Sequence, residues 1–113
     1  MIRVKPGASL DRISNRMAHV LNVADQIWHW AGIEECWVTS ANDSAHSKTS
    51  KHYPVNNISN ACEALDLRSH NIPHQRQWTL VADLSRWLGK DYDVILECVG
   101  EPNEHFHIEY DPK

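Results

Sequence analysis

The sequence has few cysteines and glycines and no long hydrophobic run. Its three cysteines, Cys36, Cys62 and Cys98, are odd in number and form no Cys-x-x-Cys pair, which argues against a disulfide framework and a cysteine-based zinc site. We expect them to be small buried thiols in strands. No apolar stretch approaches the roughly 20 residues of a membrane helix, so no membrane association is expected. The N-terminus has no apolar signal-peptide core, which predicts synthesis in the cytoplasm.

An excess of positive charge is also missing. Eleven Lys and Arg stand against fifteen Asp and Glu, which gives a net charge of -4 and an isoelectric point near 6.0. Nucleic acid is therefore not an expected partner. The 113 residues, 42% hydrophobic and 23% charged, exclude intrinsic disorder and predict a single domain over residues 1–113.

Hydrophobic periodicity predicts two helices. Apolar residues recur at helical spacing from Leu10 to Ala31, with Ser9 as the expected N-cap and Gly32 as the end. A second helix is predicted over 73–88, with Pro73 near its first turn and Gly89 after it. Residues 1–8 have no such pattern and are expected to form an arm.

Four strands are predicted, over 36–39, 61–68, 92–99 and 105–110. The last two flank a turn at 100–103 and form a hairpin, so we expect an α+β domain with a small, mainly antiparallel sheet packed with the two helices. Residues 40–60 are polar and lack periodicity. A loop of about twenty residues in so small a domain is normally functional or disordered.

The last strand alternates between two kinds of side chain. One face carries Phe106, Ile108 and Tyr110, and the other carries His105, His107 and Glu109. An apolar face beside a His-His-Glu face indicates a core side and a functional side.

The strand over 61–68 places Asp66 among small side chains, on the face opposite Leu65 and Leu67. Asp is unfavourable in a strand, and either a metal or a pairing with Arg68 would compensate it. His52 in the loop, Asp66 and one further His would supply three ligands for Zn²⁺ with the fourth position open, as in catalytic zinc sites. His105 and His107 share a face and either could be that ligand, and Glu104 beside the zinc-bound water is the expected general base.

These residues resemble a family of zinc peptidases that cut peptidoglycan peptides, the D-alanyl-D-alanine peptidases of the VanX and VanY type and the L-alanyl-D-glutamate endolysins of phages. The family motif is Ser-x-His-x-x-Gly-x-Ala-x-Asp followed by Glu-or-Asp-x-x-His. Residues 50–52, 64–68 and 104–107 match its parts. The loop between His52 and Asp66 is longer than in the family, and Cys62 stands at the position of the motif glycine.

The resemblance implies a hedgehog/D,D-peptidase fold, a Zn²⁺ ion on His52, Asp66 and His107, and Glu104 as catalytic residue. It also implies a peptidoglycan stem peptide as substrate, cleaved as a D-Ala-D-Ala carboxypeptidase or an L-Ala-D-Glu endopeptidase would cleave it, by an enzyme released to the cell wall at host lysis. We expect a monomer. Candidates for supporting or substrate-binding roles are Ser50, His46, Arg68 and His105. The alternative is a non-catalytic, metal-containing module of the same fold that binds cell wall or protein.

Overall fold

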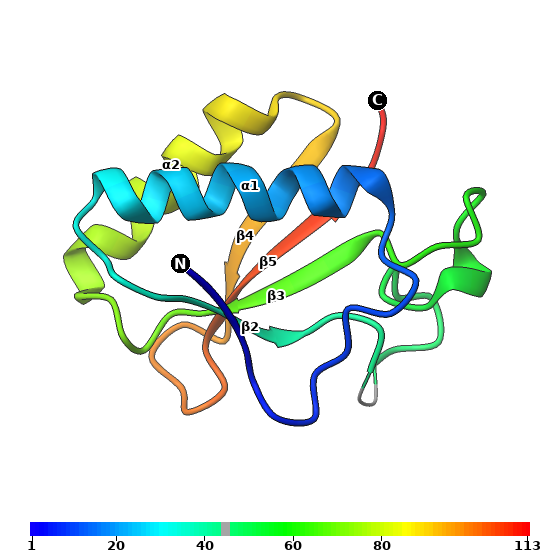
Figure 1. The fold of residues 1–113 in the computed structure, drawn as a ribbon, viewed down its shortest axis with the longest axis horizontal. Coiled ribbons are helices and arrows are strands. Elements are labelled where there is room, and N and C mark those ends of the chain that lie inside the picture. The colour runs from blue at the N-terminus through cyan, green and yellow to red at the C-terminus, as the bar shows by residue number, and fades with distance from the viewer. Residues whose placement is uncertain (44–45) are drawn as a thin grey trace.

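The computed structural model describes residues 1–43 and 46–113, which form a sheet covered on one face by two helices (Figure 1). The elements in chain order are β1 (Ile2–Val4), α1 (Asn15–Trp30), β2 (Cys36–Ser40), a short 3-10 helix (Pro54–Asn56), β3 (Ala64–Arg68), α2 (His74–Leu88), β4 (Tyr92–Glu97) and β5 (His105–Tyr110). The strand order is β1-β2-β3-β5-β4. Only the β1–β2 pair is parallel among the strands described. The predicted α+β class, with a mainly antiparallel sheet and two helices, is confirmed.

Helix α1 begins later than its apolar pattern predicts. The hydroxyl of Ser14, not Ser9, caps it by accepting a hydrogen bond from the backbone N–H of Met17 at 3.1 Å. Residues 10–13 are not helical, because Ile13 forms an isolated β-bridge with Cys62. The end of α1 is as predicted, since Gly32 follows with a φ of 76°.

Residues 2–4 are not a free arm but the edge strand β1, which pairs parallel to β2. This prediction was wrong because β1 has only three residues, and the pairing depends on α1 returning the chain to its side. Cys36 and Cys62 are buried, as expected for structural thiols, whereas Cys98 is exposed in the turn after β4.

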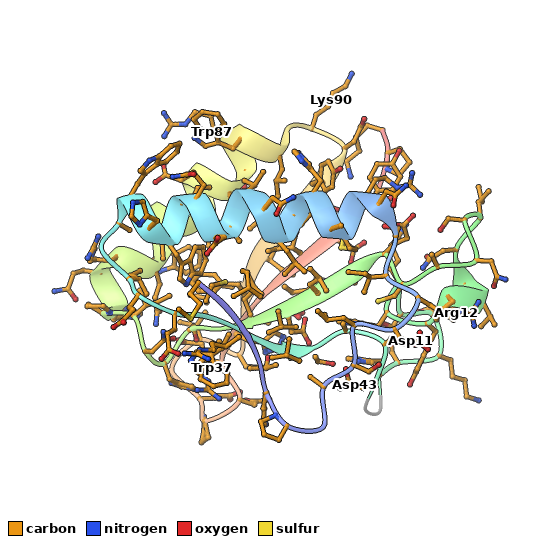
Figure 2. The ribbon with its side chains drawn as sticks, in the orientation of Figure 1. Asp11, Arg12, Trp37, Asp43, Trp87 and Lys90 are labelled. Carbon is orange, nitrogen blue, oxygen red and sulfur yellow. The ribbon has the colours of Figure 1, made fainter. Side chains whose placement is uncertain are left out.

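The core lies between the helices and one face of the sheet. The rings of Trp28 from α1 and Phe106 from β5 meet edge to face, 5.5 Å apart, and both are completely buried. Trp87 of α2 lies outside this core, at the surface (Figure 2). Because both helices cover one face of the sheet, the opposite face is left for polar side chains.

Among the described residues, no helix has the length and apolar character needed to cross a membrane.

Candidate metal centre

The open face of the sheet gathers the polar side chains of β3 and β5. Their antiparallel register places Asp66 directly opposite His107, and β4 in turn places Glu97 opposite His105. Because side chains alternate along a strand, His105, His107 and Glu109 share this face while Phe106 and Ile108 enter the core. The predicted division of β5 into a core side and a functional side is therefore seen in the fold.

His52 reaches the same face from the long loop. Its backbone N–H donates to the hydroxyl of Ser50 at 3.1 Å, and its ring is 2% exposed. Side-chain amides brace the loop around it: Asn56 donates to the carbonyls of Lys48 and Ser50, and Asn57 donates to those of Lys51 and Ala61. A loop without periodicity is thus fixed by side-chain to backbone hydrogen bonds.

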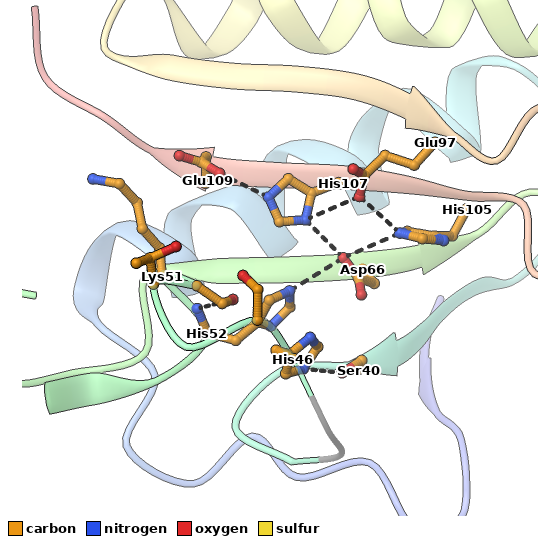
Figure 3. A pocket seen from close by; sticks show the side chains of 12 residues that line it. Ser40, His46, Lys51, His52, Asp66, Glu97, His105, His107 and Glu109 are labelled. Atoms are coloured by element: carbon orange, nitrogen blue, oxygen red, sulfur yellow. Dashed lines mark hydrogen bonds and ion pairs between the residues drawn. The ribbon is translucent and has the colours of Figure 1, made fainter. Parts of the chain in front are cut away.

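Asp66 is the centre of the cluster (Figure 3). Its Oδ1 lies 2.9 Å from Nδ1 of His107, 3.3 Å from Nε2 of His52 and 3.7 Å from Nε2 of His105. The structure therefore brings together His52, Asp66 and His107, which come from a loop and two strands. All of these side chains line one open pocket of about 600 Å³.

The outer nitrogens of two of these rings are held by acceptors. Nδ1 of His52 donates to the carbonyl of Ala41 at 2.8 Å, and Nε2 of His107 donates to Glu109 at 2.8 Å. In a neutral imidazole the other nitrogen then carries a lone pair, and in both rings that nitrogen faces Asp66. A lone pair aimed at a carboxylate oxygen is stable only with a proton or a metal ion between them. Second-shell acceptors of this kind are typical of metal-binding histidines.

In the metal-free chain the Asp66 carboxylate favours the protonated form of both rings. Burial lowers the pKa of His52, but the hydrogen bond to Asp66 and the charge of that carboxylate outweigh burial and raise the pKa to about 10. The pKa of His107 is raised in the same way, again against the effect of burial, by Asp66 and Glu109. Burial raises the pKa of Asp66, but the hydrogen bonds from the His107 and His52 rings lower this pKa by more than burial raises it. The carboxylate therefore remains ionised.

Glu104 is not part of this cluster. Its buried carboxylate accepts hydrogen bonds from the Ser69 hydroxyl at 2.6 Å, the Gln77 side-chain amide at 2.9 Å and the backbone N–H of Gly100 at 2.8 Å. The bond from Gly100, followed by that from Ser69, lowers its pKa. It lines a smaller pocket, which Asp66 and His105 also line, and not the pocket that contains His52 and His107. The structure thus gives Glu104 three structural partners and does not bring it to His52.

The other candidates are divided between the two pockets. His46 lines the main pocket, where its ring stacks on His52 at 3.8 Å and its Nε2 lies 3.0 Å from the Ser40 hydroxyl. Arg68 lines the smaller pocket, and its guanidinium lies over the ring of Trp37. Sequence reasoning had considered Arg68 as an ion-pair partner of Asp66. No such pair is found among the described residues.

Sequence reasoning missed Glu97, which lines the main pocket with Oε1 3.0 Å from Nε2 of His105. The hairpin register would have found it, because the strand before the turn places Glu97 across from His105. Two sets of ligand atoms in this pocket are close enough to hold a metal, Asp66 with Glu97, His105 and His107, and Asp66 with His46 and His52. The donor chemistry fits a divalent metal such as zinc.

Comparisons with protein-family models, with curated proteins and with solved structures gave no match. The family resemblance of the sequence motifs therefore enters the account of function only as a proposal.

Proposed function

We propose that this protein is a zinc-dependent peptidase that hydrolyses peptide bonds of peptidoglycan, with a hedgehog/D,D-peptidase type of fold. The observation that carries the proposal is the convergence of His52 and His107 on Oδ1 of Asp66, with the outer ring nitrogens held by Ala41 and Glu109. These three side chains would hold the zinc ion. Two imidazoles and one carboxylate leave a coordination position for water or substrate, as in catalytic zinc sites.

Zinc in such a position supplies Lewis-acid chemistry, which acidifies water and polarises a carbonyl oxygen. The protein's contribution is to hold the ligands in place. Glu109 fixes the His107 ring, and the Ala41 carbonyl fixes the His52 ring, so each presents one nitrogen to the centre. The open face of the sheet gives an extended peptide access to the pocket.

In this proposal the proton acceptor is His46 and not Glu104. The His46 ring stacks on His52 inside the main pocket, and the Ser40 hydroxyl holds its Nε2. From there it would take a proton from the attacking water and return it to the leaving amine. We expect His46→Gln to lower kcat by a factor of about 10² or more, the usual size of such a contribution, while the zinc content is unchanged.

The deciding experiment is digestion of purified peptidoglycan followed by mass spectrometry of the soluble products. We expect cleaved stem peptides with zinc, none after chelation, and recovery when zinc is returned. Asp66→Asn should lose both zinc and cleavage, whereas Asp83→Asn, on helix α2, should retain both. A zinc-loaded protein that releases no product from peptidoglycan would contradict the proposal.

The displacement of Glu104 favours one second candidate, a metal-containing module that binds cell-wall peptide without cutting it. Such a module would retain the metal and sediment with peptidoglycan, yet leave the products of the digestion unchanged.

A further inference from the structure

The pocket contains more metal-binding atoms than one zinc ion with an open position would use. Oε1 of Glu97 and Nε2 of His105 lie beside the atoms already described, at the end of the β4–β5 pair next to the connecting turn. The Nδ1 atom of His107 lies 2.9 Å from Oδ1 of Asp66 and 3.7 Å from Oε1 of Glu97. The Nε2 atom of His105 lies 3.0 Å from the same Glu97 oxygen and 3.7 Å from the same Asp66 oxygen. Four donor atoms thus form a closed ring (Figure 3).

In neutral imidazoles all four atoms are acceptors. Nδ1 of His105 donates to the carbonyl of Asn103 at 2.7 Å, so its Nε2 carries the lone pair that faces Glu97 and Asp66. Nδ1 of His107 is an acceptor for the same reason, because its Nε2 donates to Glu109. Four acceptors facing one another repel unless a cation lies among them.

The spacing suits zinc. Ligand atoms at about 2.0–2.1 Å from a tetrahedral Zn²⁺ lie about 3.3–3.4 Å from one another. The 3.0 Å between Glu97 and His105 and the 3.7 Å between His105 and Asp66 fall on either side of that value.

We propose that the pocket binds a second zinc ion next to the first, held by Glu97 and His105, with the Asp66 carboxylate shared between the two ions. The inference rests on the proposed function for the first ion, on His52, Asp66 and His107. The proposed function assigns His107 to the first ion, which leaves Asp66, Glu97 and His105 for the second. Glu97 and His105 face each other as a cross-strand pair, so the second position is set by the hairpin. Paired metal ions in hydrolases lie about 3.5–4 Å apart, a distance that one carboxylate can bridge.

The test is the metal content of the full chain, measured by elemental analysis after equilibration with Zn²⁺. We expect two zinc ions per chain in the wild type, and one in both His105→Gln and Glu97→Gln. The matched control is Asp111→Asn, which alters the half-buried acidic group that Asp111 forms with Asp93 and Glu109. This control should keep two ions.

A wild-type protein that saturates with one zinc ion overturns the proposal, and so does the retention of two ions in both variants. Loss of an ion in Asp111→Asn would also overturn it, by placing the second ion on the acidic surface. Substitution with Co²⁺ gives a readout that needs no variant, because two ions sharing a carboxylate show a magnetically coupled electron paramagnetic resonance spectrum. Two uncoupled ions would refute the shared Asp66.

The two proposals fail differently in these measurements. A protein with one zinc ion that still cleaves peptidoglycan overturns only the second ion. A protein with two zinc ions that leaves peptidoglycan intact overturns only the peptidase.

Discussion

The replacement of Glu104 by Gln separates a structural glutamate from a catalytic one. The carboxylate has two oxygens and three donors: Ser69 and Gln77 on Oε1 and the Gly100 backbone on Oε2. An amide of the same shape offers one oxygen and one NH₂ group. Whichever way it is turned, its NH₂ faces either the part-buried Gly100 N–H or the buried Gln77 amide, so one donor loses its acceptor.

The expected cost follows from these contacts. Hydrogen bonds to a charged group contribute about 1.5–3 kcal/mol each, and a buried donor left without a partner costs about 1–3 kcal/mol. Because the other bonds are weakened but not lost, we expect Glu104→Gln to lower the free energy of unfolding by about 2–4 kcal/mol. The zinc content should not change.

The assay is urea unfolding of the zinc-free protein, so that metal binding does not alter the measured stability. Peptidoglycan digestion is measured separately, at a temperature where the variant is fully folded. Glu101→Gln is the control, since Glu101 is an exposed residue of the same turn, and its stability should change by less than about 0.5 kcal/mol. The reasoning is refuted if Glu104→Gln is as stable as the wild type but no longer cleaves peptidoglycan, because Glu104 would then be the general base that the family resemblance implies.

Three other predictions concern the core, an ion pair and the metal. Phe106→Ala removes a buried ring packed on Trp28 and should lower the free energy of unfolding by about 3–5 kcal/mol; a loss below 1 kcal/mol would contradict this packing. Burial raises the pKa of Glu63, but hydrogen bonds from Arg16 and two serines outweigh it and lower the pKa below its ordinary value near 4.5. Its stabilising contribution is therefore present above that value and is lost as the pH falls through the folded-state pKa, so unfolding curves of the wild type and Glu63→Gln should converge in acid. Because the pKa of His52 is about 10 in the metal-free chain, zinc binding at pH 7.5 should release at least one proton. Calorimetry in buffers of different ionisation enthalpy would measure this release, and its absence would count against ligation by His52.

Local patterns decided most of the fold class. The helical spacing of apolar residues, Gly32 and Gly89 after the helices and the alternation in β5 are short-range signals, and the structure follows them. They failed where distant contacts intervene. Residues 10–13 leave the predicted helix because Ile13 pairs with Cys62, and residues 2–4 become a strand because β2 lies beside them.

The sequence alone determined which face of β5 is polar and that His52, Asp66 and His107 are of a type that binds metal. It could not determine which carboxylates meet these histidines, because that depends on strand register and on the course of the turn between β4 and β5. Register brought in Glu97 opposite His105, and the turn directed Glu104 toward Ser69 and Gln77. Residue type and period are properties of a few neighbours in the chain, whereas the position of a side chain at a shared centre depends on segments far apart in sequence.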